Sequence, residues 1–472
     1  MQIRYYSHMP FKIFNTLGRK KQVFKPAKKG QVRFYACGPT VYQRAHIGNL
    51  RTYINEDLLK RVLLLNSYKV KHVMNVTDVG HLEHDFDTGR DKVEEAAKSE
   101  KKSVWDLARE YEKIFKDDLK KLNILFPQLF PRATDHIEEQ IEIIKKLEKK
   151  KLIYRTSDGI YFDTSRFKNY GVLVKEKIKG IWAGARVKMG EKKNPTDFAL
   201  WKFSPKVGSR QMEWASPWGV GFPGWHIECS AMSIKYLGLP IDIHAGGVDH
   251  IHPHHTNEIA QSEGAFGKKF VNYWMHSEFL RVSEGRMGKS EGNAITMKEV
   301  EEKGFGPLDF RYLTLTAHYR SPLNFSWEAL EAARNARLKL EDRTREASES
   351  QSAQKTAAGK KRLEAFKKEF LDQLNDDLNM PKALAFLWKE LSHTKFHSIA
   401  YDALLFSDHV LGLKLKDVRP AKVSAEVDLL LKKREEARKA KKWDTADKIR
   451  KEIESLGFFV EDTSKGARIR QK

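Results

Sequence analysis

The sequence predicts an α/β protein with an α+β insertion, followed by an α-helical bundle and a small α+β domain. Strand-like and helix-like segments alternate in the first half, beginning with "VRFYACG" and continuing through "KVKHVMNVTD". That order predicts a parallel sheet with crossover helices. From about Phe305 onward the pattern is that of amphipathic helices rich in Leu, Lys and Glu. The polar segment "KLKDVRPAKV" then separates a short tail that is dense in Lys and Arg.

The elements are expected in the following order. Residues 1–305 form the sheet domain, interrupted at about 123–223 by a helix, a hairpin signalled by "SDG" at residues 157–159, and loops rich in Gly and Trp. The sheet resumes with "IDIHAGG" and "FVNYWMH". Residues 306–414 form the helical bundle. Residues 424–472 form the tail domain, with two helices, a stop signal at Gly457 and a short pair of strands.

Composition limits the classes of function. The 472 residues are 40% hydrophobic, which is enough for several domains, and 86 Lys and Arg against 63 Asp and Glu give a formal charge of +23. Such a charge favours a polyanionic partner, although a generally solvated basic surface is the alternative. The sequence shows neither a signal peptide nor a membrane-spanning run, so we expect a soluble, cytoplasmic protein. The only cysteines are Cys37 and Cys229, so we expect thiols rather than a disulfide framework.

The stretch "VDHIHPHHTNEIAQ" is a candidate for metal binding. Pro253 suits the first turn of a helix, in which His254 and Glu258 stand on the same face. The segment "PGWHIECSAMS" also reads as helical, and Cys37 follows a strand at the sheet edge where α/β proteins bind ligands. Cysteine, histidine and glutamate are all acceptable zinc ligands. Spacing alone leaves open that both cysteines are buried apolar residues, because neither a CxxC nor an HExxH motif is present.

Two further segments are candidates for phosphate binding. In "CGPTVYQRAHIGN" a strand runs through a Gly-Pro turn into a helix, with His46 and Asn49 near the helix N-terminus, which suits a triphosphate. In "EGRMGKSEGN" a glycine-rich loop carries Lys289, which could reach the same phosphates. The alternative for this loop is an ordinary basic turn.

Taken together, these segments resemble the cysteinyl-tRNA synthetases, a family of class I aminoacyl-tRNA synthetases. "CGPTVYQRAHIGN" is similar to the first signature, which normally ends in HIGH, and "RMGKS" is similar to the KMSKS loop. "GWHIECSAMS" and "HAGGVDHIHPHHTNEIAQSE" match the zinc and ATP-ribose segments. The resemblance continues through "SPLNFS", "DDLNMPKALAFLW" and "KKWDTADKIRKEIESLG", so it covers nearly the whole chain.

The resemblance implies a Rossmann-type catalytic domain, a helical bundle that contacts tRNA and an anticodon-binding tail. The implied reaction joins L-cysteine to tRNA(Cys) through a cysteinyl-adenylate, with ATP and Mg as substrate and one zinc that selects the thiol. The implied chain is a monomer with no membrane partner. The zinc ligands would be Cys37, Cys229, His254 and Glu258, and the cysteine pocket would include Gly38, Thr77 and Trp225. Catalysis would rest on His46, Asn49 and Lys289. ATP would contact Pro39, Thr40, His46, Gly48, Asn49, Gly246, Gly247, Asp249, Arg286, Met287, Lys289 and Ser290.

The chain also departs from the family pattern. Asn49 stands where the first signature has its second histidine, which keeps a side-chain donor but loses a cationic form. Gly288 stands where serine is usual, and the loop begins with Arg286. His250 and His252 occupy positions that are usually apolar, and we expect them to be solvated or beside the ligands rather than to bind metal.

Two other functions compete with this interpretation. A related ligase family joins cysteine to an amino sugar with the same catalytic half, but the long basic helical C-terminus argues against it. A non-catalytic RNA-binding paralogue would be favoured if the departures at Asn49 and Gly288 mark a loss of activity. Pyrophosphate exchange that depends on the amino acid distinguishes a paralogue from an enzyme.

Overall fold

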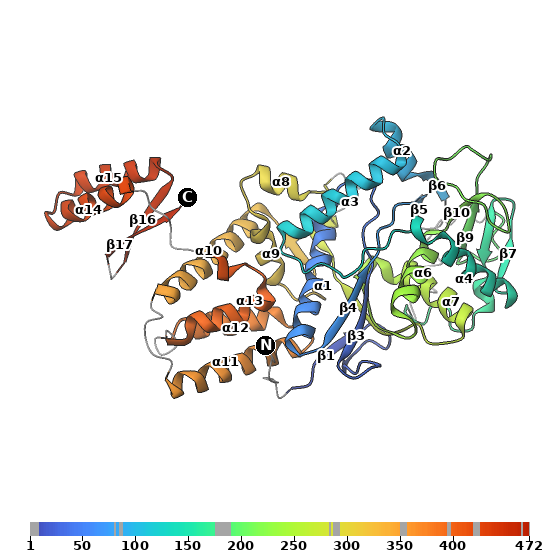
Figure 1. Ribbon diagram of the computed structural model, residues 1–472, viewed down its shortest axis with the longest axis horizontal. Coiled ribbons are helices and arrows are strands. Elements are labelled where there is room, and N and C mark those ends of the chain that lie inside the picture. The colour runs from blue at the N-terminus through green and yellow to red at the C-terminus, as the bar shows by residue number, and fades with distance from the viewer. Residues whose placement is uncertain are drawn as a thin grey trace.

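The structure is a computed structural model of the chain. It describes residues 9–79, 82–84, 88–174, 190–282, 285–286, 293–349, 356–393, 398–418, 425–463 and 466–471. A sheet domain, a helical bundle and a small tail follow one another along the chain (Figure 1). The residues at which each of these three domains begins and ends stay a prediction. Within the described part of the chain, none of the helices has the length and apolar character needed to cross a membrane.

A four-stranded parallel sheet forms the centre of the sheet domain, in the order β12-β11-β3-β4. The strands are β3 (Gln31–Ala36), β4 (Lys69–Met74), β11 (Ile241–Gly247) and β12 (Val271–Ser277). The helices around it are α1 (Ile47–Leu65), α6 (Trp225–Leu237) and α7 (His254–Phe266). Helix α1 connects β3 to β4, and α7 connects β11 to β12. The predicted parallel sheet with crossover helices is therefore confirmed.

Apolar side chains bury both faces of this sheet. Phe34 and Ala36 pack in the cluster that contains the apolar residues of α1. Tyr35 and Cys37 pack instead in the cluster that contains Cys229 of α6. Successive side chains of a strand point to opposite faces, so Cys37 lies on the α6 side of the sheet. Because both faces are covered near the carboxyl ends, β3 and β4 are buried continuously over their last three residues, whereas their first residues alternate between buried and more exposed side chains.

The segment between β4 and β11 contains a second sheet, which is antiparallel in the order β10-β9-β8-β7. Its strands are β7 (Ile153–Arg155), β8 (Gly159–Phe162), β9 (Phe198–Phe203) and β10 (Gly221–Pro223). The pairing of β7 with β8 confirms the hairpin predicted from "SDG". The same segment also holds α2 (Lys92–Ser99), α3 (Val104–Lys121), α4 (Ile137–Lys149), β5 (Leu82–His84) and β6 (Thr88–Asp91). The insertion thus rests beside the parallel sheet and leaves β3 and β11 paired.

Helices dominate the chain after the parallel sheet. They are α8 (Met297–Glu302), α9 (Pro307–Leu315), α10 (Trp327–Glu349), α11 (Ala357–Asn375), α12 (Met380–Leu391) and α13 (Ala400–Leu411). The expectation of helices alone after Phe305 is wrong at β15 (Leu323–Phe325). This strand pairs in parallel with β13 (Leu280–Val282), which also pairs with β14 (Gly285–Arg286). Three residues are too few for a periodic pattern to reveal a strand.

A buried ionic cluster joins the bundle to the sheet domain. Asp57 of α1 accepts hydrogen bonds from Arg61 Nε at 2.7 Å and from Arg311 Nη2 of α9 at 2.6 Å. Arg311 also donates to the carbonyl oxygen of Leu411 at the end of α13. Burial raises the pKa of Asp57, but the charges of Arg311 and Arg61 outweigh it and hold this pKa below its ordinary value. The bundle is therefore fixed to α1, the helix that begins at the site described below.

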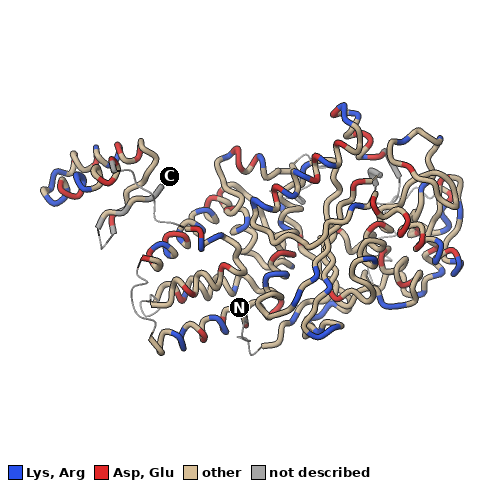
Figure 2. The backbone as a smooth tube through the Cα atoms, viewed as in Figure 1, with Lys and Arg blue, Asp and Glu red and all other residues tan. Residues whose placement is uncertain are grey.

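The tail is a small domain with its own core. It consists of α14 (Ala425–Lys439), α15 (Trp443–Ser455), β16 (Phe458–Thr463) and β17 (Gly466–Gln471). The strands pair antiparallel, and Gly457 takes a φ of +88° where α15 ends, which confirms the two helices, the stop signal and the strand pair. Lys and Arg lie along both tail helices (Figure 2). At the other end of the chain, β1 (Lys12–Asn15) and β2 (Lys20–Val23) form a hairpin.

Glu56 of α1 carries a buried carboxyl group whose removal is expected to stabilise the fold. Both carboxyl oxygens lack a hydrogen-bond partner among the described residues, and burial raises the pKa of Glu56 well above its ordinary value. Because the pKa of Glu56 is higher in the native state than in the unfolded chain, the native state is most stable below the unfolded pKa. This stability is lost as pH rises through the folded pKa, where the buried carboxyl group must ionise. Glu56→Met should therefore raise stability by on the order of 1 kcal/mol or more at pH 8, and by less at pH 5.

Thermal unfolding at both pH values measures this difference. Glu331→Met on α10 is the matched control, because the side chain of Glu331 is exposed. Equal changes in melting temperature for the two variants at pH 8 would contradict the prediction.

Candidate functional site

A cavity of about 210 Å³ opens at the carboxyl ends of β3 and β11. Its described lining contains eight of the predicted site residues, namely Cys37, Gly38, Pro39, Thr40, His46, Asn49, Gly247 and Asp249. Gly48, Gly246, Thr77 and Trp225 are not among these lining residues. Arg286 lies in β14, while Met287, Lys289 and Ser290 lie outside the described residues, so the structure does not place the predicted phosphate loop.

The first turn of α1 forms one end of this cavity. His46 is the N-cap, and its Nδ1 accepts a hydrogen bond from the backbone N–H of Asn49 at 3.2 Å. The side chain of Asn49 accepts in return from the backbone N–H of His46 at 3.3 Å. Because Nδ1 is an acceptor here, the neutral His46 ring carries its proton on Nε2. The reciprocal bonds orient both side chains beside a helix N-terminus, which favours negative charge.

Four buried side chains meet at the other end of the site. Cys37 follows β3, Cys229 lies on α6, and His254 and Glu258 lie one turn apart on α7. One donor atom from each lies within 4.8 Å of all the others, and His254 Nε2 is 3.0 Å from Glu258 Oε1. The structure therefore brings together the four residues that were predicted as metal ligands.

The electrostatics of this cluster suit a cation. Burial raises the pKa of Cys37 and of Glu258 well above their ordinary values. The hydrogen bond from Cys37 lowers the pKa of Cys229, even though burial opposes this shift. Neither carboxyl oxygen of Glu258 forms a hydrogen bond among the described residues, although the side chain is fully buried and His254 Nε2 lies 3.0 Å from Oε1. A bound cation would satisfy these oxygens, and two sulfur atoms with one nitrogen and one oxygen match the preferences of zinc.

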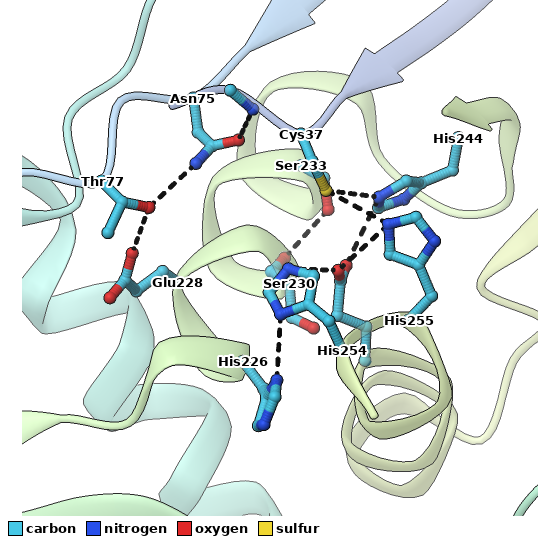
Figure 3. A network of polar contacts seen from close by, with 12 residues as sticks. Cys37, Asn75, Thr77, His226, Glu228, Ser230, Ser233, His244, His254 and His255 are labelled. Carbon is cyan, nitrogen blue, oxygen red and sulfur yellow. Dashed lines mark hydrogen bonds and ion pairs between the residues drawn. The ribbon is translucent and has the colours of Figure 1, made fainter. Parts of the chain in front are cut away.

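Residues predicted for the amino-acid pocket border this cluster. The Trp225 ring stacks on the His254 ring with centroids 4.1 Å apart. Thr77 is buried and donates a hydrogen bond to Glu228 Oε2 at 2.8 Å (Figure 3). The backbone of Gly38 packs directly against that of Asn75. A Cβ atom on residue 38 would lie 1.7 Å from the Asn75 carbonyl oxygen, so this position requires glycine.

Comparison with known proteins identifies the family. The model described as "tRNA synthetases class I (C) catalytic domain" matches residues 23–335, and "Cysteinyl-tRNA ligase anticodon binding domain" matches residues 421–470. Cysteine–tRNA ligase 1 of Burkholderia lata is 48% identical, over 98% of this chain and 97% of that protein. The chain belongs to the cysteinyl-tRNA synthetase family. The cysteine–tRNA ligase of Treponema denticola is 43% identical, over 96% of this chain and 98% of that protein.

Solved structures support the fold expected of a cysteinyl-tRNA synthetase. A methionyl-tRNA synthetase of Mycobacterium tuberculosis, in complex with methionyl-adenylate, superposes with a TM-score of 0.57. It is 16% identical and covers 81% of this chain and 90% of its own. At this identity the likeness shows the fold alone, which is the Rossmann-type fold of the class I synthetases predicted from the sequence.

Sequence reasoning missed a second donor set in this family member. Cys37 and Glu258 also lie with His244 of β11 and His255 of α7 inside the same 4.8 Å limit. Cys37 Sγ is 3.4 Å from His244 Nε2 and 3.2 Å from His255 Nε2. The "HH" pair and the histidine in "IDIHAGG" were visible signals, but only the pairing of β3 with β11 makes them neighbours. The set with Cys229 offers two thiols, which zinc prefers to a single thiol with two imidazoles.

His250 and His252 belong to neither donor set among the described residues. His250 lies in the short helix η4 (Val248–Ile251), with its ring centroid 5.4 Å from that of His254. Its Nδ1 is 2.6 Å from where a Cβ on Gly246 would stand, so the ring fits only because residue 246 is glycine. Burial lowers the pKa of His252. His250 therefore lies beside the cluster and also lines the cavity.

Proposed function

We propose that the chain ligates L-cysteine to tRNA(Cys) by way of a cysteinyl-adenylate. The main support for this proposal is the cavity, because the chain belongs to the cysteinyl-tRNA synthetase family. Its lining includes Cys37, which belongs to the buried donor set with Cys229, and it includes the helix start with His46 and Asn49. A thiol amino acid and a nucleoside triphosphate can therefore meet inside one site.

The first step is an in-line displacement at the α-phosphate of ATP. A carboxylate oxygen of cysteine bonds to the α-phosphorus, and the bond from phosphorus to the pyrophosphate oxygen breaks. The carboxylate is already a nucleophile, so this step requires no general base. Catalysis then rests on alignment and on stabilisation of the developing charge, for which we assign His46, Asn49 and Lys289. His46 Nε2–H and the N-terminus of α1 support the first two assignments.

The remaining contacts are assigned as the family resemblance implies. ATP is assigned to Pro39, Thr40, Gly48, Gly246, Gly247, Asp249, Arg286, Met287 and Ser290, of which Gly246, Gly247 and Asp249 receive the ribose. Cysteine is assigned to Gly38, Thr77 and Trp225. Cys37, Cys229, His254 and Glu258 would hold zinc, which supplies selective binding of the substrate thiolate. The adenylate then reacts with the terminal ribose of tRNA, whose hydroxyl oxygen bonds to the carbonyl carbon as AMP leaves.

The tail domain is assigned to the tRNA anticodon. Unstacked bases are recognised by aromatic stacking combined with positive charge. Trp443 at the start of α15 is 56% exposed, and the Arg438 guanidinium lies 5.6 Å from its ring centroid. The match of this segment to an anticodon binding domain supports the assignment and favours a tRNA ligase over a ligase that joins cysteine to an amino sugar.

Aminoacylation with purified tRNA tests the proposed function. The full-length chain should form cysteinyl-tRNA in the presence of ATP and Mg, and it should catalyse pyrophosphate exchange that depends on cysteine. A chain that binds tRNA but shows no such exchange would instead be a non-catalytic paralogue.

Deleting the residues after 422 separates the two parts of this function. Adenylate formation should stay nearly intact, because every described residue of the cavity lies before residue 422. The affinity for tRNA should fall by about tenfold or more, and its salt dependence should become shallower as phosphate contacts are lost. Filter binding at several salt concentrations measures both effects. An unchanged tRNA affinity in the truncated chain would refute the anticodon assignment.

A further inference from the structure

A continuous chain of hydrogen bonds connects the loop after β3 to helix α6 (Figure 3). The backbone N–H of Gly38 donates to Asn75 Oδ1 at 2.8 Å, and Asn75 Nδ2 donates to Thr77 Oγ1 at 3.2 Å. Thr77 Oγ1 donates to Glu228 Oε2 at 2.8 Å. The side chains of Asn75, Thr77 and Glu228 are all buried. The chain of bonds therefore links three separate segments away from solvent.

The hydroxyl group of Thr77 has its polarity fixed by these bonds. A hydroxyl has one hydrogen to donate and two lone pairs that accept. Glu228 takes the hydrogen, and the amide of Asn75 occupies one lone pair. One lone pair remains, so Thr77 can accept one further hydrogen bond but cannot donate one.

The backbone holds Thr77 beside the cavity. Thr77 N–H donates to the Pro39 carbonyl oxygen at 3.0 Å, and Val41 N–H donates to the Thr77 carbonyl oxygen at 3.0 Å. Pro39 and Val41 both line the cavity. The backbone of Thr77 is therefore held against two lining residues, and its hydroxyl is held in turn by Asn75 and Glu228.

Glu228 also places a buried carboxyl group behind the Thr77 hydroxyl. Its Oε1 has no hydrogen-bond partner among the described residues, and the side chain is fully buried. Thr77 can donate to Oε2 in either protonation state of Glu228, because a proton on this group can sit on Oε1. A cationic hydrogen-bond donor matches a buried hydroxyl that can only accept, since electrostatic attraction is stronger away from water.

We propose that Glu228 is a positioning residue that makes Thr77 an acceptor for the α-ammonium group of the substrate. The inference rests on the proposed function, in which Thr77 borders the cysteine. The thiol is recognised by the donors at Cys37 and Cys229, and the ammonium is recognised at Thr77. Separate groups thus bind the thiol and the ammonium of the amino acid. Loss of Glu228 should weaken only the binding of the ammonium.

Comparison of cysteine with 3-mercaptopropionate tests this division, because the second compound has the thiol and carboxylate but lacks the ammonium group. The assay is formation of radiolabelled cysteinyl-tRNA by the zinc-loaded, full-length chain, which gives KM for cysteine and the inhibition constant of 3-mercaptopropionate. Glu228→Met should raise KM by about 10- to 100-fold, as for loss of a hydrogen bond to a charged group. The inhibition constant should change less than about twofold, and kcat should change little.

Matched variants distinguish positioning from a general loss of structure. Glu228→Gln should be intermediate, because its amide oxygen can still accept from Thr77 but its amide nitrogen can also turn toward Thr77 as a donor. Thr77→Val should show the same split between the two compounds, and Thr77→Ser should restore wild-type behaviour. The two Thr77 variants decide the question if Glu228→Met does not fold.

Several results would overturn the inference. Equal weakening of both compounds in Glu228→Met or Thr77→Val would place the effect on the fold or the metal. No change in KM in these variants would remove any role for the hydrogen-bond chain. A wild-type chain that forms no cysteinyl-tRNA would instead overturn the proposed function on which the inference rests, and this result is obtained before any variant is measured.

Discussion

Replacing Cys229 with alanine is expected to remove bound zinc and to abolish nearly all activation of cysteine. Cys229 contributes one of the two sulfur atoms of the predicted ligand set, and it is buried on α6 beside Cys37 and Glu258. Loss of groups that only support metal ligands typically costs about 10- to 100-fold in affinity or activity. Loss of a ligand should therefore lower kcat/KM for cysteine by at least about a hundredfold. Elemental analysis and pyrophosphate exchange measure the two effects.

Two further variants determine which of the two possible donor sets binds the metal. His244→Gln should keep about one zinc per chain, because His244 belongs only to the alternative set with His255. Ser233→Ala, one helical turn from Cys229 on the same helix, is the control for damage to α6, since the Ser233 hydroxyl bonds to the Ser230 carbonyl oxygen. Zinc that stays in Cys229→Ala but is lost in His244→Gln would transfer the site to the alternative set. Active wild-type protein without zinc would refute both.

The second large effect expected is the rejection of serine at the activation step. Serine differs from cysteine by oxygen in place of sulfur, and an ordinary apolar pocket separates near-isosteres by only about a hundredfold. A thiol has a free pKa of about 8.5, which a metal lowers further, so it can bind as a thiolate near neutral pH. An alcohol stays protonated under the same conditions. The ratio of kcat/KM for cysteine to that for serine should therefore exceed a hundredfold by orders of magnitude.

Pyrophosphate exchange with each amino acid in the zinc-loaded enzyme measures this ratio. The four predicted ligands explain the selectivity only if serine is rejected before serine adenylate forms. Comparable activation of serine, or serine adenylate that forms and is then hydrolysed, would show that the metal is structural. The removal of zinc by a chelator provides the control, since it should reduce cysteine activation far more than the small residual activation of serine.

Local sequence patterns were sufficient for the parts of the site that lie within one or two helical turns. His254 and Glu258 are four residues apart, and any α-helix places such residues on one face. His46 and Asn49 form a reciprocal cap because the start of α1 leaves backbone N–H groups that the side chains can satisfy. The alternation of strands and helices predicted the parallel sheet for a similar reason, since the spacing of apolar residues along the sequence differs between a strand and a helix.

The sequence by itself therefore determined the helix faces, the family to which the chain belongs and the order of the elements apart from the short strand β15. Only the tertiary structure decided that β3 pairs with β11, which brings Cys37 beside residues of α6 and α7 that are distant in the chain. It also placed His244 and His255 around the same thiol, and it joined Gly38, Asn75, Thr77 and Glu228 in one chain of hydrogen bonds. The physical reason is range: backbone geometry fixes contacts within a few residues, whereas contacts between distant segments depend on how whole elements bury their apolar faces against one another.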